Sequence, residues 1–356
     1  MSPAALSRSE PATRASPWRR RARIGVALFS IGALGLVIWK ATALDWPSAW
    51  RAIGSLPASA LLLATAAALL GHANYGAFDL LARRWLRLDI GRLRCWAIAL
   101  VSYACTLNFG ALLGGAAMRW RLYDAAGLGG KAIAQVVTLA IVTNWLGFAS
   151  LAAGLVLLQG QGLLSEAHAA EPTQVQGAVA EVASAVRHWL EGSVPPTLAS
   201  GVLALLAAWA VLVAWRGIPP WRALRLQWQL PTRPQALAQW LLGMANWLCM
   251  VAVLWCLLQP LAAQPVSFGL VLWTHLLASL AVLVARIPGG IGVLEAVYLW
   301  LLHDQVASGP LLGALLVFRA LYFLLPLVWA GVGYALLTRA PRAGPERPAA
   351  LPAPAR

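Results

Sequence analysis

The chain has 356 residues, of which 60% are hydrophobic and 11% are charged, and its mean hydropathy is +0.72. Soluble domains carry about 25% charged residues, so this chain could not cover its apolar runs with polar surface in water. The net charge of +15 does not indicate nucleic-acid binding, because the arginines lie in short loops rather than on a basic face with interleaved aromatic side chains. Helices satisfy their own backbone hydrogen bonds in lipid, and the long apolar runs predict an all-α polytopic integral membrane protein.

Residues 1–23 carry six arginines and precede the first apolar run. A basic start followed by an apolar run is typical of a signal peptide, but Trp39 and Lys40 follow it instead of a small-residue cleavage site. We interpret 1–23 as a retained basic cytoplasmic tail.

About eight apolar segments approach the roughly 20 residues that a membrane-spanning helix needs. They are residues 24–41, 56–82, 95–117, 135–158, 197–215, 236–258, 267–302 and 310–337. Arginine and lysine are concentrated before, between or after them in five stretches: 1–23, 83–94, 119–131, 216–235 and 338–356. An excess of basic residues marks cytoplasmic loops, so the N- and C-termini are both predicted to be cytoplasmic.

The loops 83–94 and 119–131 both have this basic character, although an apolar segment separates them. An ordinary span at 95–117 would place one of the loops outside. We therefore predict that 95–117 enters from the cytoplasm, breaks near Asn108–Gly115 and returns, since glycine accepts the backbone angles of a turn. A plain kinked span with one loop on the unexpected side is the alternative.

The second half has the same pattern, because 267–302 is interrupted by Pro288, Gly289 and Gly290. Residues 24–158 and 197–337 are therefore predicted to be two inverted membrane repeats, each with one broken segment. Broken segments at matching places in two halves indicate a transport site near the membrane midplane. The connecting loop 159–196 has apolar residues at helical spacing, which predicts an extracytoplasmic amphipathic helix acting as a connector or lid. The Ala/Pro/Arg tail 338–356 is predicted to be cytoplasmic.

Several polar side chains fall inside apolar segments, where ionisable groups are costly and mark candidate function. They are His72, Asp79, Arg119, His275, Arg286, Glu295 and Arg319, with Asn74, Asn108, Asn144 and Asn246. Asp79 and Arg119 lie near segment ends and either reach the interface or act inside. The histidines are interpreted as structural hydrogen-bond partners rather than a proton relay, and the asparagines as interhelical contacts. Glu295 and Arg319 are predicted to form an ion pair, with Arg319 facing an anionic headgroup as the alternative.

Motifs of known catalytic chemistry are missing from the sequence: GxSxG, HExxH and Walker A do not occur. The four cysteines all lie in apolar stretches without a CxxC pair or a His/Cys cluster. The sequence therefore predicts neither an enzyme nor a metal or cofactor site.

Three stretches resemble signatures of the membrane flippase domain of lysylphosphatidylglycerol synthases. They are Asn108–Tyr123 with Gly127, Pro288–Glu295, and Arg319–Pro326 with Gly331, and the resemblance covers roughly residues 20–340. It implies a stand-alone flippase domain that moves an aminoacylated or other anionic phospholipid between leaflets. The synthase domain of full-length members has no counterpart here, which implies a separate lipid-modifying enzyme as partner.

The sequence thus favours a lipid flippase of a bacterial inner membrane with a central polar groove. Its predicted substrate-binding residues are Asn108, Gly114, Gly115, Arg119, Arg286, Pro288, Gly289, Gly290, Glu295 and Arg319. The arginines would bind phosphate through charge-assisted hydrogen bonds, while Asn108 and Glu295 would position the headgroup. The alternative is a membrane scaffold or accessory subunit that transports nothing.

Overall fold

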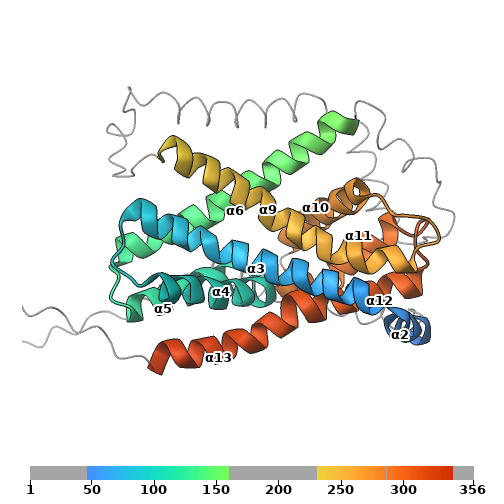
Figure 1. Ribbon diagram of the computed structural model, residues 1–356, viewed down its shortest axis with the longest axis horizontal. Helices are drawn as coiled ribbons and strands as arrows, with labels where there is room; N and C mark the ends of the chain where they lie inside the picture. Colours follow the sequence, from blue (N-terminus) through green and yellow to red (C-terminus); the bar gives the residue numbers. More distant parts are fainter. Residues whose placement is uncertain (1–45, 160–230, 286, 340–356) are drawn as a thin grey trace, which may run out of the picture. The chain divides into compact units, whose positions relative to one another are not determined.

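The computed structural model describes residues 46–159, 231–285 and 287–339, all within one compact unit, Asp45–Arg356. Every regular element in these ranges is a helix, which confirms the predicted all-α class (Figure 1). The first half contains α2 (Trp46–Ser55), α3 (Ala58–Leu86), α4 (Arg92–Phe109), η1 (Ala111–Ala116), α5 (Ala117–Ala125) and α6 (Gly130–Gln159). The second half contains α9 (Arg233–Leu258), η4 (Gln259–Leu261), α10 (Phe268–Ala285), η5 (Pro288–Gly290), α11 (Val293–Leu301), α12 (Ser308–Arg319), η6 (Ala320–Leu324) and α13 (Leu325–Arg339).

Five helices within the described ranges are long and apolar enough to cross a membrane. They are Ala58–Leu86, Gly130–Val156, Arg233–Leu261, Phe268–Ala285 and Ser308–Arg339. The eight predicted segments are thus not all confirmed. The segments 24–41 and 197–215 lie outside the described residues, as do the basic tail 1–23, nearly all of the loop 159–196 and the tail beyond 339.

The predicted break in 95–117 is confirmed as a helical hairpin. α4 ends at Phe109, and Gly110 turns the chain with φ +87°, a conformation that favours glycine. The chain returns along α4 through η1, a π-helix, and α5, so that the Tyr123 hydroxyl lies 3.3 Å from the Cys95 sulfur. The prediction was wrong about its extent: the hairpin runs to Ala125, and Arg119 lies inside α5 instead of a loop. Hydropathy alone could not find this arm, because α5 carries three charged side chains in nine residues.

The second predicted break forms a matching hairpin from α10 and α11. Gly289, Gly290 and Gly292 all have positive φ, which allows the tight turn at Pro288–Gly290. The Nδ1 atom of His275 lies 2.8 Å from the Tyr298 hydroxyl and joins the two arms. This contact confirms the structural hydrogen bond predicted for that histidine.

Both halves follow the order long helix, broken hairpin, long helix, and they run in opposite directions. The Asn74 amide donates to Leu242 O, while Gly71 lies against Cys249, so α3 and α9 are antiparallel. Figure 1 shows α6 crossing α9, and the crossing is close because Gly147 and Gly243 have no side chains to separate the backbones. Opposed directions of equivalent helices are what the inverted-repeat prediction requires.

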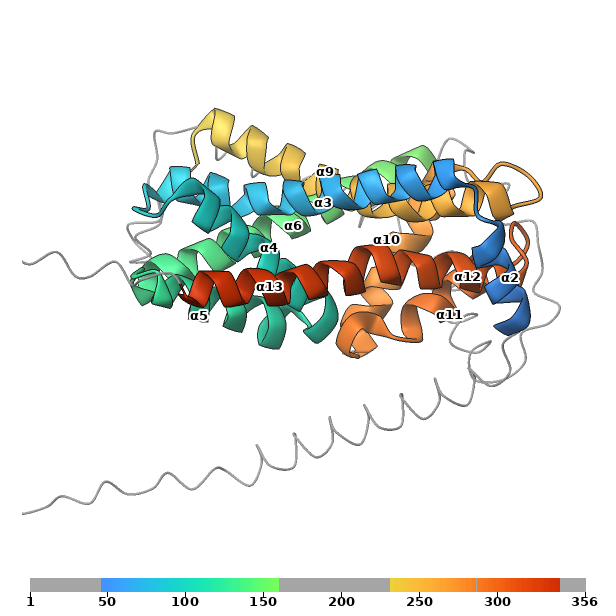
Figure 2. The ribbon, with the colours of Figure 1, turned by 60° about the horizontal axis from the view of Figure 1, so that its bottom comes forward.

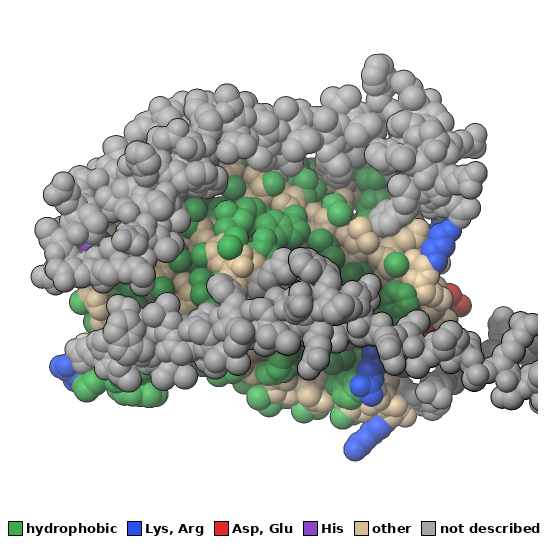
Figure 3. All heavy atoms as spheres, turned by 180° about the vertical axis from the view of Figure 1, so that it is seen from behind, with side chains coloured by type: hydrophobic (Ala, Val, Ile, Leu, Met, Phe, Trp, Pro, Cys, Tyr) green, Lys and Arg blue, Asp and Glu red, His purple; other side chains and the backbone are tan. Residues whose placement is uncertain are grey.

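The basic ends of the described helices gather at one end of the unit. The ends of α3, α5 and α13 and the starts of α4 and α6 lie together at the left of Figure 1. The Arg121 guanidinium there lies 5.3 Å from the centre of the Tyr334 ring. On the face seen in Figure 3, Lys and Arg side chains appear near the ends, and hydrophobic side chains cover much of the described surface between them. Both loops flanking the first hairpin therefore lie at the same end of the helices.

This arrangement predicts that both loops face the same side of the membrane. Single cysteines at the exposed positions Arg84 and Asp124, in a background without the four native cysteines, should both be shielded from an impermeant reagent added outside. Labelling of intact and opened cells measures this. Outside labelling of one position but not the other would contradict the hairpin.

Candidate functional site

The two hairpins meet at their tips, although they come from opposite halves of the chain. A Cβ atom placed on Gly289 would lie 3.5 Å from the carbonyl oxygen of Asn108 and 3.8 Å from that of Leu107. Figure 2 shows the two hairpins next to one another along the α12–α13 helix. We call the contact between Leu107–Gly110 and Pro288–Gly290, together with Glu295 and Arg319, the hairpin junction.

Arg319 binds the tip of the second hairpin. Its Nη1 atom donates to Gly289 O (2.8 Å) and its Nη2 atom to Gly290 O (3.0 Å). Its Nε and Nη2 atoms also bind the Glu295 carboxylate, with Nη2 3.0 Å from Oε2, which confirms the predicted ion pair. Both side chains are largely buried, at 14% and 13% exposure. One arginine therefore fixes both the turn and the first turn of α11.

Glu295 and Asn108 complete this set of contacts. Glu295 accepts the Gly292 N–H (2.8 Å) and so caps the start of α11. The Asn108 amide donates to Phe323 O at 3.0 Å, which ties the first hairpin to η6. As predicted, this asparagine makes an interhelical contact. η6 is a π-helix directly after Arg319, and such π segments are rare and frequent at functional sites.

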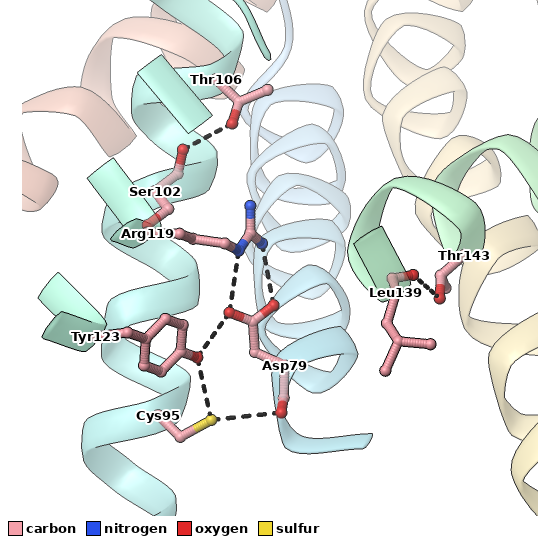
Figure 4. Close-up of polar contacts among 8 residues, drawn as sticks. All are labelled: Asp79, Cys95, Ser102, Thr106, Arg119, Tyr123, Leu139 and Thr143. Carbon is pink, nitrogen blue, oxygen red and sulfur yellow. Dashed lines mark hydrogen bonds and ion pairs between the residues drawn. The ribbon is translucent and has the colours of Figure 1, made fainter. Parts of the chain in front are cut away.

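A second buried ion pair holds the first hairpin against α3 (Figure 4). Arg119 Nε and Nη2 each lie 3.1 Å from a different oxygen of Asp79, and the Tyr123 hydroxyl donates to the same carboxylate at 2.8 Å. Asp79 is 0% exposed and Arg119 is 3% exposed. Of the two alternatives that the sequence left open for these residues, their burial favours a position inside the protein. The remaining guanidinium nitrogen of Arg119 points away from Asp79 in Figure 4.

The pairing of Asp79 with Arg119 is not predicted from the sequence, because both residues lie near the ends of apolar segments. The sequence signal for this pair is charge, because an acid and a base in apolar surroundings each need a partner of opposite charge.

Gly114 and Gly115, predicted as substrate-binding residues, lie inside the first hairpin. A Cβ atom on them would come within 2.0 Å of Cys105 O and 2.2 Å of Thr106 Oγ1, so they allow the two arms to approach closely. Arg286 lies outside the described residues.

A buried chain of polar side chains lies beside the junction and was not predicted as a unit. The Tyr103 hydroxyl lies 3.1 Å from that of Tyr322 and 3.5 Å from Asn246 Oδ1, and the Asn246 amide donates to Asn144 Oδ1 at 3.2 Å. The side chains come from α4, η6, α9 and α6. The tyrosines gave no signal in the sequence, since buried tyrosine is common in apolar helices.

Long apolar helices, opposed halves and charges held inside the protein define a multi-pass integral membrane protein. Over 334 residues, 93% of this chain and 95% of the relative, it is 31% identical to the inner membrane protein YbhN of Escherichia coli (strain K12). The chain belongs to the family of that protein and is an inner-membrane protein. It is also 28% identical over 311 residues, 86% of this chain and 88% of the relative, to the uncharacterized protein slr0712 of Synechocystis sp. (strain ATCC 27184 / PCC 6803 / Kazusa). No protein-family model matches the chain.

Proposed function

We propose that the protein is a flippase that moves a phospholipid between the leaflets of the inner membrane. The observation that carries this proposal is the hairpin junction, where two broken membrane segments from opposed halves touch. Non-helical backbone at membrane depth is tolerated only where protein or a polar cavity surrounds it. Transporters built from inverted repeats bind their substrates at such breaks.

The chemistry of the junction favours an anionic headgroup. Arg319 offers a planar set of donors that fits a phosphate, and its present acceptors are the Glu295 carboxylate and two carbonyl oxygens. An arriving phosphate would take the place of the carboxylate on the guanidinium. Glu295, once released, would accept hydrogen bonds from a headgroup amine or hydroxyl. With a headgroup amine this exchange leaves no charge unpaired, and an unpaired charge is the main cost of moving a lipid headgroup through an apolar core.

The other predicted residues support this exchange from further away. Asn108 would hold the first hairpin at the junction, and the paired Arg119 would position it through Asp79. The lipid tails would remain in the bilayer along the apolar outer faces, where Leu69 and Val328 are more than 60% exposed. The resemblance to lysylphosphatidylglycerol flippase domains supports the same function. A separate lipid-modifying enzyme as partner and cytoplasmic termini remain part of this proposal.

The proposal is tested with purified protein in vesicles that contain a labelled anionic phospholipid. Exchange of the label between leaflets should be faster than in protein-free vesicles of the same composition. The assay is repeated with anionic, zwitterionic and aminoacylated headgroups, with and without a proton gradient. The headgroup whose exchange is accelerated most identifies the cargo. If no headgroup moves faster than in protein-free vesicles, a scaffold or accessory role replaces transport.

A further inference from the structure

His72 on α3 holds a buried nitrogen that no described residue satisfies. Its Nδ1 atom lies 2.8 Å from Ala68 O, and a carbonyl oxygen only accepts, so Nδ1 carries the proton of the neutral ring. Nε2 is then left with a free lone pair, and no described donor reaches it. The ring is 9% exposed. Buried polar atoms without a partner are rare in folded proteins, and each one calls for an explanation.

His72 differs from the other residues with such an atom in what it can bind. The described buried side-chain atoms without a partner also include one each in Arg94, Ser102 and Thr274. None of those three groups changes charge near neutral pH, whereas imidazole does. A lone pair held open on an imidazole is a site for a proton.

The surroundings of His72 connect it to the hairpin junction. The ring centres of Tyr322 and Tyr103 lie 4.6 Å and 5.2 Å from that of His72. Tyr322 precedes Phe323, whose carbonyl oxygen holds Asn108. A change in the charge of His72 can therefore reach η6 and the first hairpin through Tyr322, Phe323 and Asn108.

The titratable groups around His72 offer no counter-charge. They are Tyr103 from α4, Tyr322 from η6, Cys249 from α9 at the neighbouring Gly71, and Tyr75 on α3 itself. Arg119 from α5 lies over the ring of Tyr75 and is already paired with Asp79. No described carboxylate pairs with His72. A charged ring would therefore be costly in the closed arrangement and favoured once water reaches it.

We infer that His72 is a proton-binding site, neutral while the hairpin junction is closed and protonated when it opens. A hydronium ion gives its proton to the Nε2 lone pair, a new N–H bond forms, a water molecule is left, and the ring gains one positive charge. The part of this inference that couples the proton to lipid movement rests on the proposed function. The binding of the proton itself does not.

Proton binding is tested by NMR on 15N-histidine-labelled protein in lipid nanodiscs between about pH 5 and 8. One histidine signal should pass from neutral to protonated, disappear in His72→Gln and remain in His303→Gln, a control at a half-exposed histidine beside Asp304. Gln keeps a donor for Ala68 O, and His72→Asn provides the assignment if His72→Gln does not fold. A His72 signal that stays neutral over the whole range overturns the inference.

Coupling is tested in the vesicle assay at two pH values. The wild-type exchange rate should change by roughly fivefold or more between them, and the rate of His72→Gln should hardly change at equal helix content. If His72→Gln keeps the pH dependence of the wild type, the coupling is overturned. Loss of the pH dependence at equal helix content is not expected if His72 has only a structural role. If the NMR signal titrates but wild-type protein moves no lipid at either pH, the proton site stands and the flippase proposal fails.

Discussion

Arg119→Gln should destabilise the folded protein by about 3–5 kcal/mol, because it leaves the Asp79 carboxylate unpaired in the core. Asp79 is fully buried and takes both of its salt-bridge hydrogen bonds from Arg119. The tyrosine that also binds the carboxylate cannot neutralise it. Unfolding of the purified protein by denaturant or heat, followed by circular dichroism, measures the loss.

Arg121→Gln is the matched control for this prediction. Arg121 lies two residues further along α5, is exposed, and its guanidinium lies over the ring of Tyr334. Its replacement should change stability by about 0.5 kcal/mol or less, as expected for an exposed site. Equal losses in the two variants would show that the Asp79–Arg119 contact is not the cause.

Glu295→Gln and Arg319→Gln should each destabilise the protein by about 3 kcal/mol or more, because each leaves a largely buried charge without its partner. Arg319→Gln has a further consequence, since the carbonyl oxygens of Gly289 and Gly290 lose their donor. The double variant should recover part of the loss, with a coupling energy of about 0.5–3 kcal/mol. Unfolding measurements on the two single variants and the double variant give this coupling directly.

Simple addition of the two single effects would contradict the ion pair, because residues in contact deviate from additivity. Arg339→Gln, at the exposed end of α13, controls for the loss of a positive charge on the same long helix. Arg339→Gln should leave the stability of the protein unchanged, and it should leave the coupling energy between Glu295 and Arg319 unchanged when it is added to their variants.

The hairpins were predictable from the sequence because two independent patterns agreed on them. The basic loops on either side of the first hairpin required a return to the same side, and glycine or proline marked each turn. The Glu295–Arg319 pair was predictable because both charges lie deep in apolar runs. These inferences use local composition and one membrane rule, both of which can be read from the sequence.

Other parts depend on tertiary packing and could not be read in this way. Arg119 looks like a loop residue because Arg121 and Asp124 follow it closely, and only the position of α3 reveals its partner. The contact of Asn108 with Phe323 depends on a π-helix, whose register no hydrophobic period encodes. The Nε2 atom of His72 is left without a partner because no donor from the described neighbouring helices reaches it, and this depends on how those helices pack. The location of the candidate site and its Glu295–Arg319 pair are therefore predictable from the sequence, whereas its other hydrogen bonds are not.

Two asparagines offer the most direct test of the hairpin junction as the transport site. Asn108 and Asn74 are both half-buried, and each donates one interhelical hydrogen bond to a carbonyl oxygen, at 3.0 Å and 2.9 Å. Asn108 joins the first hairpin to η6, whereas Asn74 joins α3 to α9, neither of which belongs to a hairpin. Their replacement by alanine should cost similar stability, about 1 kcal/mol each.

The decisive measurement is the rate of anionic phospholipid exchange in vesicles that contain wild-type protein, Asn108→Ala or Asn74→Ala at equal amounts of folded protein. We expect a rate reduced by about tenfold in Asn108→Ala, as for a misplaced binding group, and a rate near that of the wild type in Asn74→Ala. Equal rates in the two variants, or wild-type exchange no faster than in protein-free vesicles, would contradict it.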